Sequence, residues 1–323
     1  MVRNNDVTRF GIYLSSSGSY LLMKIKRTNP GWIAEFHALS PRRASPSVTV
    51  HPLVTRAGPI YLHATMWEVA MAFDEAATID SLWAARLRGD FFPDEWLDRL
   101  TIDQAYRVQL GILARRSAAG ARQIGWKVAL TSKPTQEQFN FHEPAFGHVL
   151  EQFPSGHRFP ADMIRPGCEP EICVRLARPI EAGTDADAVR AAIEVCYPAL
   201  EIVELRCDLR RDMALGLADN VAQKAVVLGA PVRMGDMPDL AGIETRVRVN
   251  GVEVANGLGA AVLDHPLNAI VWLAGKLPEY GQALKAGDLI MTGSFTRMVP
   301  LAAGDQVEAT FAGFGLVEAG VAA

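Results

Sequence analysis

The sequence predicts an α+β protein in which a helical N-terminal part precedes a larger, strand-rich part. Apolar residues follow helical spacing from Met66 to about residue 120, strict alternation follows at residues 123–130, and strand patterns dominate from Arg165 onward. The chain has 323 residues, of which 49% are apolar, so a substantial core can form. We expect residues 66–323 to form one domain, with helices in 66–120 and mostly strands in 121–323.

The first 65 residues differ from the rest of the chain. They contain a serine-rich stretch, basic residues and prolines, without a sustained helical or strand period. We therefore expect residues 1–65 to be a poorly structured appendage, such as would result from a mis-assigned upstream start codon. A partner-binding arm is the alternative interpretation.

Helical spacing opens at Met66 and continues through Phe73 to Trp83. A second helix should begin at Thr101, because Thr101-Ile-Asp-Gln104 has the form of a capping box. In the following strand, residues 123–130 place Trp126 and Val128 on one face. Lys127 then projects from the other face among small neighbours, which leaves room for a ligand.

Two helices and several turns interrupt the C-terminal strands. Residues Asp185–Val195 and Pro266–Ala274 have helical patterns, the second with proline in its first turn. Asn250-Gly251 between two strand patterns predicts a type I′ hairpin. Lys285–Asp288 and Ala302–Asp305 are expected to be turns that lead into strands.

Composition excludes several classes of protein. The net charge of −4 shows no basic excess, which argues against nucleic-acid binding. No apolar stretch approaches the roughly 18 to 20 residues of a membrane span, and no signal peptide is recognised, so a cytoplasmic location is expected. The four cysteines form no C-x-x-C pair and are expected to be reduced core thiols. Gly257-Leu-Gly259 resembles part of a dinucleotide-binding fingerprint but lacks its third glycine, which argues against a nicotinamide-dependent enzyme.

Two acidic segments carry the strongest chemical signal. In a strand, Glu169 and Glu171 share one face about 7 Å apart at the backbone, while Ile172 and Val174 are placed to pack into the core. Pro170 cannot donate a ladder hydrogen bond, so this part of the strand is expected to be an edge or a terminus. The alternative is that the two acids are solvated or form salt bridges, because an E-x-E pair alone is a weak motif.

A second acidic strand follows at residues 199–205. Glu201 shares a face with Ala199, Val203 and Leu205, whereas Glu204 lies on the opposite face with Arg206 and is expected to be a paired surface charge. An isolated buried carboxylate is costly. A hard cation with oxygen ligands, Mg²⁺ or Mn²⁺, would relieve the repulsion among Glu169, Glu171 and Glu201.

Several segments, in the same order along the chain, resemble the fumarylacetoacetate hydrolase superfamily, in the branch of 2-oxopent-4-enoate hydratase and 4-oxalocrotonate decarboxylase. The resemblance runs from about Met66 to the C-terminus. It is carried by Leu100–Tyr106, Gly125–Ser132, Glu169–Glu171, Pro198–Glu204, Gly259–Ala269 and Ala286–Ser294. It implies a rolled mixed β-structure enclosing a metal, so that residues 66–323 would be a catalytic domain with a mixed β-roll at 121–323.

The resemblance also implies roles for particular residues. Glu169, Glu171 and Glu201 match the positions that hold magnesium or manganese, and Lys127 matches an active-site lysine. The segment Glu143–Gly147 corresponds to a loop near the substrate, so Phe146 and Gly147 are expected substrate-binding residues. Ser294 is expected to donate a hydrogen bond to the substrate; closing a turn is its alternative role. Many hydratases have Asp at the position of Ala145, and its absence weakens a strict hydratase assignment.

Other polar residues keep two interpretations each. His142 and His148 flank the Glu143–Gly147 segment and could reach a substrate. His265 is expected to organise a helix start rather than to act in chemistry. Asp219-Asn220 could brace the site or cap a helix, and Gln109 could lie on a helix surface or contribute to the site.

The expected activity is that of a divalent-metal-dependent lyase, a hydratase that adds water to a 2-hydroxy-2,4-dienoate or 2-oxo-4-enoate in aromatic meta-cleavage catabolism. A 4-oxalocrotonate-type decarboxylase, an acylpyruvate C–C hydrolase and a non-catalytic homologue that binds a partner are the alternatives. The resemblance implies a small 2-oxo acid substrate, a homo-oligomer and association with a homologous decarboxylase or hydratase of the same pathway.

Overall fold

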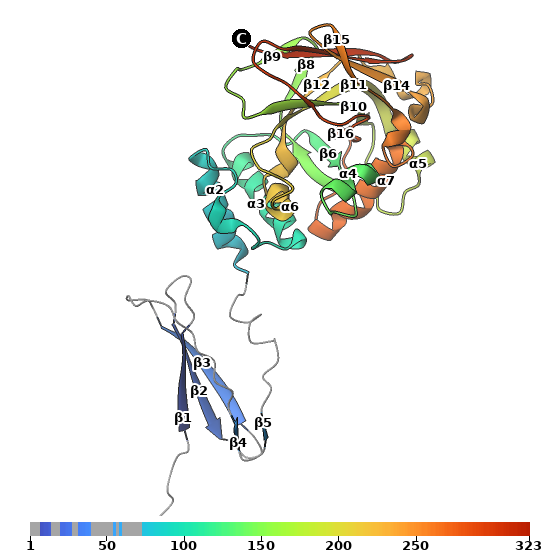
Figure 1. Ribbon diagram of the computed structural model, residues 1–323. Helices are drawn as coiled ribbons and strands as arrows, with labels where there is room; N and C mark the ends of the chain where they lie inside the picture. Colours follow the sequence, from blue (N-terminus) through green and yellow to red (C-terminus); the bar gives the residue numbers. More distant parts are fainter. Residues whose placement is uncertain (1–6, 14–19, 28–31, 40–53, 56–57, 60–72) are drawn as a thin grey trace, which may run out of the picture. The chain divides into compact units, whose positions relative to one another are not determined.

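The computed structural model describes residues 7–13, 20–27, 32–39, 54–55, 58–59 and 73–323. The chain divides into two compact units, Met1–Ala72 and Phe73–Ala323 (Figure 1). The predicted boundary at residue 66 and the helical spacing at 66–72 lie outside the described residues. In the part of the chain that the structure describes, no helix combines the length and apolar character that crossing a membrane requires.

The first unit contains an antiparallel three-stranded sheet. Its strands are β1 (Val7–Tyr13), β2 (Tyr20–Arg27) and β3 (Trp32–Leu39), and β4 (Val54–Thr55) pairs with β5 (Gly58–Pro59). The sequence pattern predicted no sustained strand period in this region. The strands are rich in β-branched, aromatic and other apolar residues but do not alternate strictly, so propensity rather than periodicity favours them. The role of residues 1–65 as an appendage stays a prediction.

The second unit opens with helices, as predicted. They are α2 (Glu75–Leu87), the 3₁₀ turn η1 (Asp94–Trp96) and α3 (Ile102–Ala118). The capping box is confirmed, because Thr101 Oγ1 accepts from the Gln104 amide and the Gln104 side chain accepts from the Thr101 amide. Helix α6 (Met213–Ala218) packs against α3. Short helix α4 (Lys133–Gln138) follows the first strand of the unit.

A nine-stranded sheet dominates the second unit, with the main strand order β7-β6-β16-β10-β11-β12-β8 (Figure 1). The short strands β13 and β17 pair with β11 and β10. The bounds are β6 Gly125–Ala129, β7 Ala145–Val149, β8 Gln152–Pro154, β10 Pro166–Leu176, β11 Ile193–Glu204, β12 Gln223–Leu228, β13 Val232–Arg233, β16 Leu289–Met291 and β17 Val299–Pro300.

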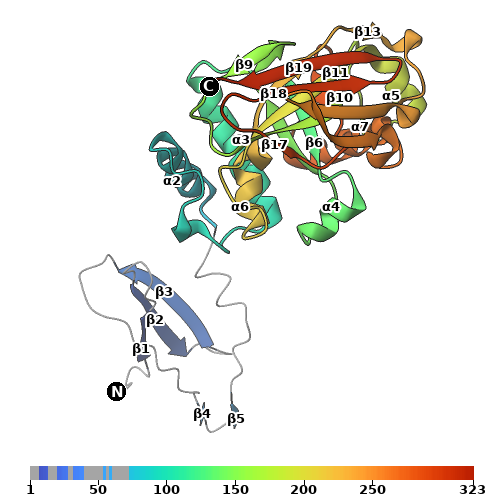
Figure 2. The ribbon, with the colours of Figure 1, turned by 45° about the horizontal axis from the view of Figure 1, so that its top comes forward.

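A second sheet of five strands has the order β15-β14-β18-β19-β9. Its strands β18 and β19 lie against β11 of the first sheet, as Figure 2 shows. The bounds are β9 His157–Phe159, β14 Glu244–Val249, β15 Val252–Leu258, β18 Gln306–Phe311 and β19 Gly315–Val321. The predicted hairpin is confirmed between β14 and β15, with Asn250 at φ 52° and Gly251 at φ 81° as a type I′ turn requires.

Two further helices pack together beside the first sheet. Helix α7 (Pro266–Lys276) begins where predicted and runs two residues further, and it also contacts β6. Helix α5 covers only Ala186–Ala192, so the prediction that it continues to Val195 is wrong. The chain becomes strand β11 at Ile193, where the β-branched residues Ile193 and Val195 and the aromatic Tyr197 alternate with smaller or polar residues.

The central pair β10–β11 places the acidic residues on one face. Their antiparallel register sets Glu169 opposite Glu201 and Glu171 opposite Ala199, while Ile172 and Ile202 point to the main hydrophobic core. The predicted sharing of faces is therefore confirmed, and so is the α+β class with curled mixed sheets. All four cysteines are buried free thiols, as expected.

Pro170 is not at an edge or at a strand end, so that prediction is wrong. It lies in the middle of β10 and faces Leu200 of β11. On its other side the ladder is interrupted, because β17 pairs only with residues 167–168 and β16 only with 173–175. The Phe295 amide donates to the Pro170 carbonyl at 3.0 Å in this gap. Since no strand of the described residues pairs with Pro170 on that side, its missing N–H costs no ladder bond.

Candidate active site

The strand register brings three carboxylates together. Glu169 and Glu171 lie two residues apart on β10, and Glu201 is directly opposite Glu169 on β11. One carboxylate oxygen from each residue lies within 4.8 Å of the other two. Glu171 and Glu201 are buried, and Glu169 is partly exposed. The predicted convergence of these side chains is present in the structure.

The carboxylates are held in an environment that disfavours their charge. Burial, together with the nearby charge of Glu201, raises the pKa of Glu169 to about 7. Burial and the charges of Glu201 and Glu169 raise the pKa of Glu171 well above its ordinary value, although the Gly293 amide donates to its Oε2 at 2.8 Å. Burial also raises the pKa of Glu201. A cluster of this kind needs positive charge to remain ionised.

Lys127 supplies one positive charge. It lies on β6 with 1% of its surface exposed, and its Nζ is 3.2 Å from Glu201 Oε1. Neither oxygen of Glu201 accepts a hydrogen bond of acceptable geometry from the described residues, so the contact with Lys127 is an ion pair of imperfect direction. When all three carboxylates are ionised, the ammonium group of Lys127 balances one negative charge and two remain.

The donor set fits a divalent metal ion. Oxygen ligands that converge from a rigid pair of strands suit a hard cation such as Mg²⁺ or Mn²⁺, and the unpartnered oxygens of Glu201 have ligand capacity left. Among the described residues, this is the cluster of potential ligands that the geometry identifies. Glu169, Glu171 and Glu201 would hold the ion.

The segment after β16 forms another wall of the site. Gly293 adopts φ 112°, and a Cβ there would lie 2.5 Å from Thr131 Oγ1, so glycine is required for its amide to reach Glu171. Ser294 follows directly and is partly exposed. Its hydroxyl lies 3.4 Å from the Thr296 amide. Ser294 is therefore next in the chain to the residue whose amide contacts Glu171, and its hydrogen bond to a substrate stays a prediction.

Strand β7 places the expected substrate residues on two different faces. Gly147 is opposite Lys127 in the β6–β7 register, and a Cβ on it would lie 3.2 Å from Lys127 Cε, so the glycine leaves room for the lysine. Ala145, two residues earlier, lies on that same face. Phe146 points to the other face, where its ring stacks on Tyr106 at 4.2 Å. The structure thus places Phe146 away from Lys127.

The expectation of a loop at Glu143–Gly147 is wrong for most of the segment, because strand β7 begins at Ala145 and is buried throughout. Its backbone pairs with β6, and the ring of Phe146 stacks on Tyr106 of α3, which favours a strand. Glu143 precedes the strand and its Oε2 lies 3.6 Å from Lys276 Nζ.

The histidines separate clearly. His265 caps α7, since its Nδ1 accepts from the Leu267 amide at 3.1 Å, as expected. His142 is exposed. His148 is buried on the face of β7 that points away from Lys127. Neither of its ring nitrogens has a hydrogen-bond partner among the described residues. Burial lowers its pKa to about 3, and Arg116, Arg86 and Arg206 add to this effect.

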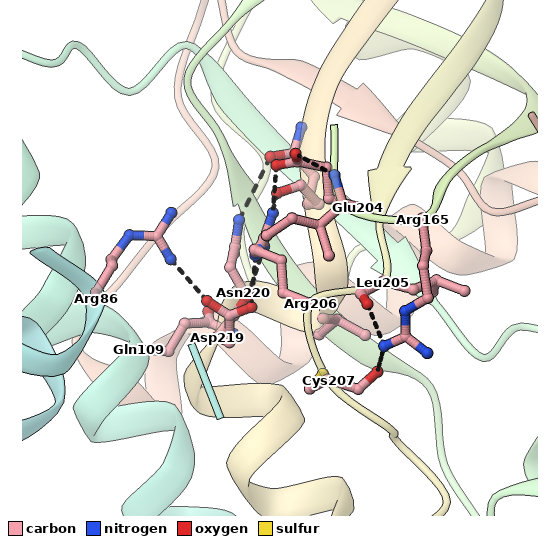
Figure 3. A network of polar contacts seen from close by, with 12 residues as sticks. Arg86, Gln109, Arg165, Glu204, Leu205, Arg206, Cys207, Asp219 and Asn220 are labelled. Carbon is pink, nitrogen blue, oxygen red and sulfur yellow. Dashed lines mark hydrogen bonds and ion pairs between the residues drawn. The ribbon is translucent and has the colours of Figure 1, made fainter. Parts of the chain in front are cut away.

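Arg206, Asp219 and Arg86 belong to a polar network that the sequence predicted only in part (Figure 3). Arg206 donates to Asp219 Oδ2 at 2.7 Å and to the carbonyls of Asp219 and Gln223 at 3.2 Å each. Arg86 donates to Asp219 Oδ1 at 2.6 Å. Asp219 therefore fills both roles that the sequence left open: its side chain braces the structure through the two arginines, and its backbone N–H donates to the carbonyls of Leu215 and Leu217 as the C-cap of α6, whose N-cap is Asp212. Sequence spacing could not reveal these partners, because Arg86 and Asp219 are 133 residues apart.

Two neighbours of this network also have defined roles. Glu204 pairs with Arg206 at 3.2 Å as predicted, but it is only partly exposed and Arg206 is buried, so the pair is not a surface one. Gln109 is buried on α3 and donates to the carbonyls of Phe146 and Leu217, which excludes the helix-surface alternative.

The fold and the carboxylate site define a family. Residues 144–322 match the family described as "Fumarylacetoacetate (FAA) hydrolase C-terminal", which is more than half of the chain. The chain belongs to this family, as the resemblance implied.

Particular relatives narrow the branch. The chain is 35% identical to 2-hydroxyhexa-2,4-dienoate hydratase of Comamonas testosteroni over 223 residues, which cover 67% of this chain and 84% of the relative. It is 34% identical to 2-oxo-hept-4-ene-1,7-dioate hydratase of Escherichia coli, over 68% of this chain and 86% of that protein.

A solved structure is also similar. The 4-oxalocrotonate decarboxylase from Pseudomonas putida G7, complexed with magnesium and adipate, has a TM-score of 0.68 and 30% sequence identity to this chain. The match covers 80% of this chain and 98% of the decarboxylase. The relatives are thus hydratases and a decarboxylase of one family, and this structural neighbour contains a divalent metal ion.

Proposed function

We propose that this protein is a divalent-metal-dependent lyase that adds water to a 2-hydroxy-2,4-dienoate or 2-oxo-4-enoate, as in aromatic meta-cleavage catabolism. The observation that carries the proposal is the convergence of the carboxylates of Glu169, Glu171 and Glu201, with the ammonium group of Lys127 3.2 Å from Glu201 Oε1. The names of the hydratase relatives support the substrate class.

A metal ion and Lys127 would have different roles in the reaction. A bound Mg²⁺ or Mn²⁺ would supply Lewis-acid stabilisation of the charge that develops when a 2-oxo acid is enolised. Glu169, Glu171 and Glu201 hold that cation. Lys127, beside Glu201, binds the substrate carboxylate or transfers a proton. Ser294 donates a hydrogen bond to the substrate, and Gly147, which has no side chain, leaves room for Lys127.

A spectrophotometric assay tests the proposal. Purified protein with Mg²⁺ or Mn²⁺ should remove the absorbance of 2-hydroxypenta-2,4-dienoate, and chelation should stop the reaction. Glu171→Ala should be inactive, whereas Glu194→Gln should retain activity because Glu194 is an exposed residue of β11 paired with Arg175. Turnover that survives chelation and the Glu171 substitution would refute the proposal.

Decarboxylation of a 4-oxalocrotonate-type substrate is the second candidate. Ala145 lies on the Lys127 face of β7 and is fully buried, so the position where many hydratases have a carboxylate provides no proton donor here. The similarity to the decarboxylase structure points in the same direction. Release of carbon dioxide from 4-oxalocrotonate, without consumption of the dienoate, would favour this candidate over hydration.

Assembly and location complete the proposal. We propose a homo-oligomer, which can associate with a homologous pathway enzyme, and a cytoplasmic location. Large apolar side chains are exposed on β15 and β19, namely Val252, Val254, Leu258 and Leu316, and surfaces of this kind support association. The free, buried cysteines agree with a reducing compartment. Light scattering of the purified protein tests the assembly; a monomer at micromolar concentration would contradict it.

A further inference from the structure

Lys127 is held from two sides. Its Nζ lies 3.2 Å from Glu201 Oε1, and it donates a hydrogen bond to the Val221 carbonyl at 3.1 Å. The lysine lies on β6, whereas Val221 belongs to a turn that follows α6 and is 94 residues away in sequence. The position of the ammonium group therefore depends on where this turn places one carbonyl oxygen.

The turn has a conformation that its residues do not favour. Asn220, Val221 and Ala222 have φ angles of 62°, 50° and 61°, so three successive non-glycine residues are left-handed. Asparagine tolerates this region, but a β-branched valine rarely does. A strained turn persists only where its surroundings hold it.

Side chains hold both ends of the turn and its first residue. Arg206 binds the carbonyls of Asp219 and Gln223, which flank the turn, and also Asp219 Oδ2. The Asn220 amide side chain accepts from the His148 amide at 2.8 Å and donates to the His148 carbonyl at 2.9 Å, which ties the turn to β7. Gly147 permits this approach, because a Cβ there would lie 2.7 Å from Asn220 Oδ1.

We propose that Arg206, Asp219 and Asn220 are positioning residues that act through the Val221 carbonyl on Lys127. By holding the left-handed turn, they give the ammonium group a second partner and prevent it from moving into the carboxylate cluster. Glu169, Glu171 and Glu201 then remain free to bind a divalent cation. If the turn relaxes, Lys127 approaches the three carboxylates and competes with the cation for their negative charge.

Manganese affinity measures this competition without substrate. Arg206→Lys removes the guanidinium fork that reaches two carbonyls at once. Asn220→Gly keeps a residue that accepts positive φ but removes both bonds to His148. Each substitution is made alone and combined with Lys127→Met, and the Kd for Mn²⁺ is measured by titration calorimetry or by electron paramagnetic resonance of free Mn²⁺. The four proteins of each set form a double-mutant cycle.

In the Lys127 background, each substitution should raise the Kd for Mn²⁺ about tenfold, an estimate for one displaced charge. In the Lys127→Met background the same substitution should change the Kd less than about twofold, because the competing ammonium group is absent. Equal fold-changes in both backgrounds would overturn the inference, since a purely structural role of the turn predicts additive effects. If Arg206→Lys does not fold, Asn220→Gly carries the same test alone.

Val317→Ala is the matched control for lost stability. It removes buried apolar volume from β19, which belongs to the second sheet, and it should leave the Kd for Mn²⁺ unchanged. The role of Lys127 in turnover rests on the proposed function, and kcat of Arg206→Lys should fall about tenfold through its misplacement. If the wild-type protein turns over none of the offered substrates, the proposed function fails, while the Mn²⁺ cycle still decides the inference.

Discussion

Two buried clusters of charged side chains in residues 73–323 differ in how completely their charges are paired. The carboxylate cluster combines Glu169, Glu171 and Glu201 with the ammonium group of Lys127, and two oxygens of Glu201 accept no well-directed hydrogen bond. In the arginine cluster, Arg206 and Arg86 share the carboxylate of Asp219, and Arg206 also satisfies two backbone carbonyls. Both clusters lie close to the same turn, residues 219–223.

This difference in charge balance distinguishes a ligand-binding site, the carboxylate cluster, from a structural cluster, the arginine cluster. A buried charge that is fully paired and hydrogen-bonded fixes geometry, and nothing more is needed to keep it ionised. A buried cluster with surplus charge is stable only when a ligand or bound protons compensate it, which is typical of functional sites. The carboxylate cluster should therefore respond strongly to metal ions, and the arginine cluster should not.

The largest expected effect comes from Glu171→Gln. The amide keeps the size of the side chain but removes one of three anionic ligands, so kcat should fall by roughly 10³-fold or more and Mn²⁺ affinity should fall in parallel. Activity with Mg²⁺ and calorimetric titration with Mn²⁺ provide the two measurements. Glu194→Gln, on the exposed part of β11, is the control and should match the wild type. A Glu171→Gln protein that binds Mn²⁺ normally would show that the ion is held elsewhere.

Lys127→Met should separate chemistry from metal binding. The methionine fills a similar volume without charge, so kcat should fall roughly 10² to 10⁴-fold, the usual contribution of a positioned acid or base. Mn²⁺ should bind at least as tightly as to the wild type, because a positive charge 3.2 Å from Glu201 has been removed. Weaker Mn²⁺ binding in this variant would instead make Lys127 a support for the ligands and contradict its proposed role.

Local sequence signals predicted much of the fold. The capping box at Thr101, the Asn250-Gly251 hairpin and Pro266 each specify an element through a few neighbouring residues, and all three are confirmed. The strands of residues 7–39 were missed because they lack strict alternation. The end of α5 was misplaced because Ile193 to Val195 fit either a helix or a strand locally, and pairing with β10 selects the strand.

Local sequence signals also predicted part of the candidate site, and the rest depends on tertiary packing. The faces of Glu169, Glu171, Glu201 and Lys127 could be predicted because strand period is local, and the family resemblance supplied the metal-binding role of the three acids and the active-site role of the lysine. The left-handed turn could not be predicted, since nothing in Asn220-Val221-Ala222 marks three residues for positive φ. Arg206, Arg86 and Asp219 come from distant segments, and only the packing of α2, α6 and β11 brings them together.

Removing the metal ion should change stability by a smaller, measurable amount. At a Mg²⁺ concentration about 100 times its Kd, binding to the folded state should add about 2.7 kcal/mol, which raises Tm by roughly 5–10 °C for a unit of this size. Scanning calorimetry with and without chelator measures the shift. Glu171→Gln should lose the shift, and Glu194→Gln should retain it. An equal shift in both variants would mean that Mg²⁺ acts outside the carboxylate cluster.

The pH dependence of stability tests how closed the arginine cluster is, because His148 is buried beside it. Burial beside three arginines lowers its pKa from 6.5 to about 3, so the folded state keeps it neutral while the unfolded state binds a proton below pH 6.5. The neutral His148 therefore costs no unfolding free energy above about pH 6.5. As the pH decreases toward 3 it lowers the free energy of unfolding, by about 2 kcal/mol at pH 5. Urea unfolding at pH 7.5 and 5 should show this loss in the wild type and a smaller loss in His148→Gln. His142→Gln, at an exposed position, should keep the full loss. The same loss in all three proteins would show that His148 accepts a proton without unfolding, and that the arginine cluster is less closed than its hydrogen bonds indicate.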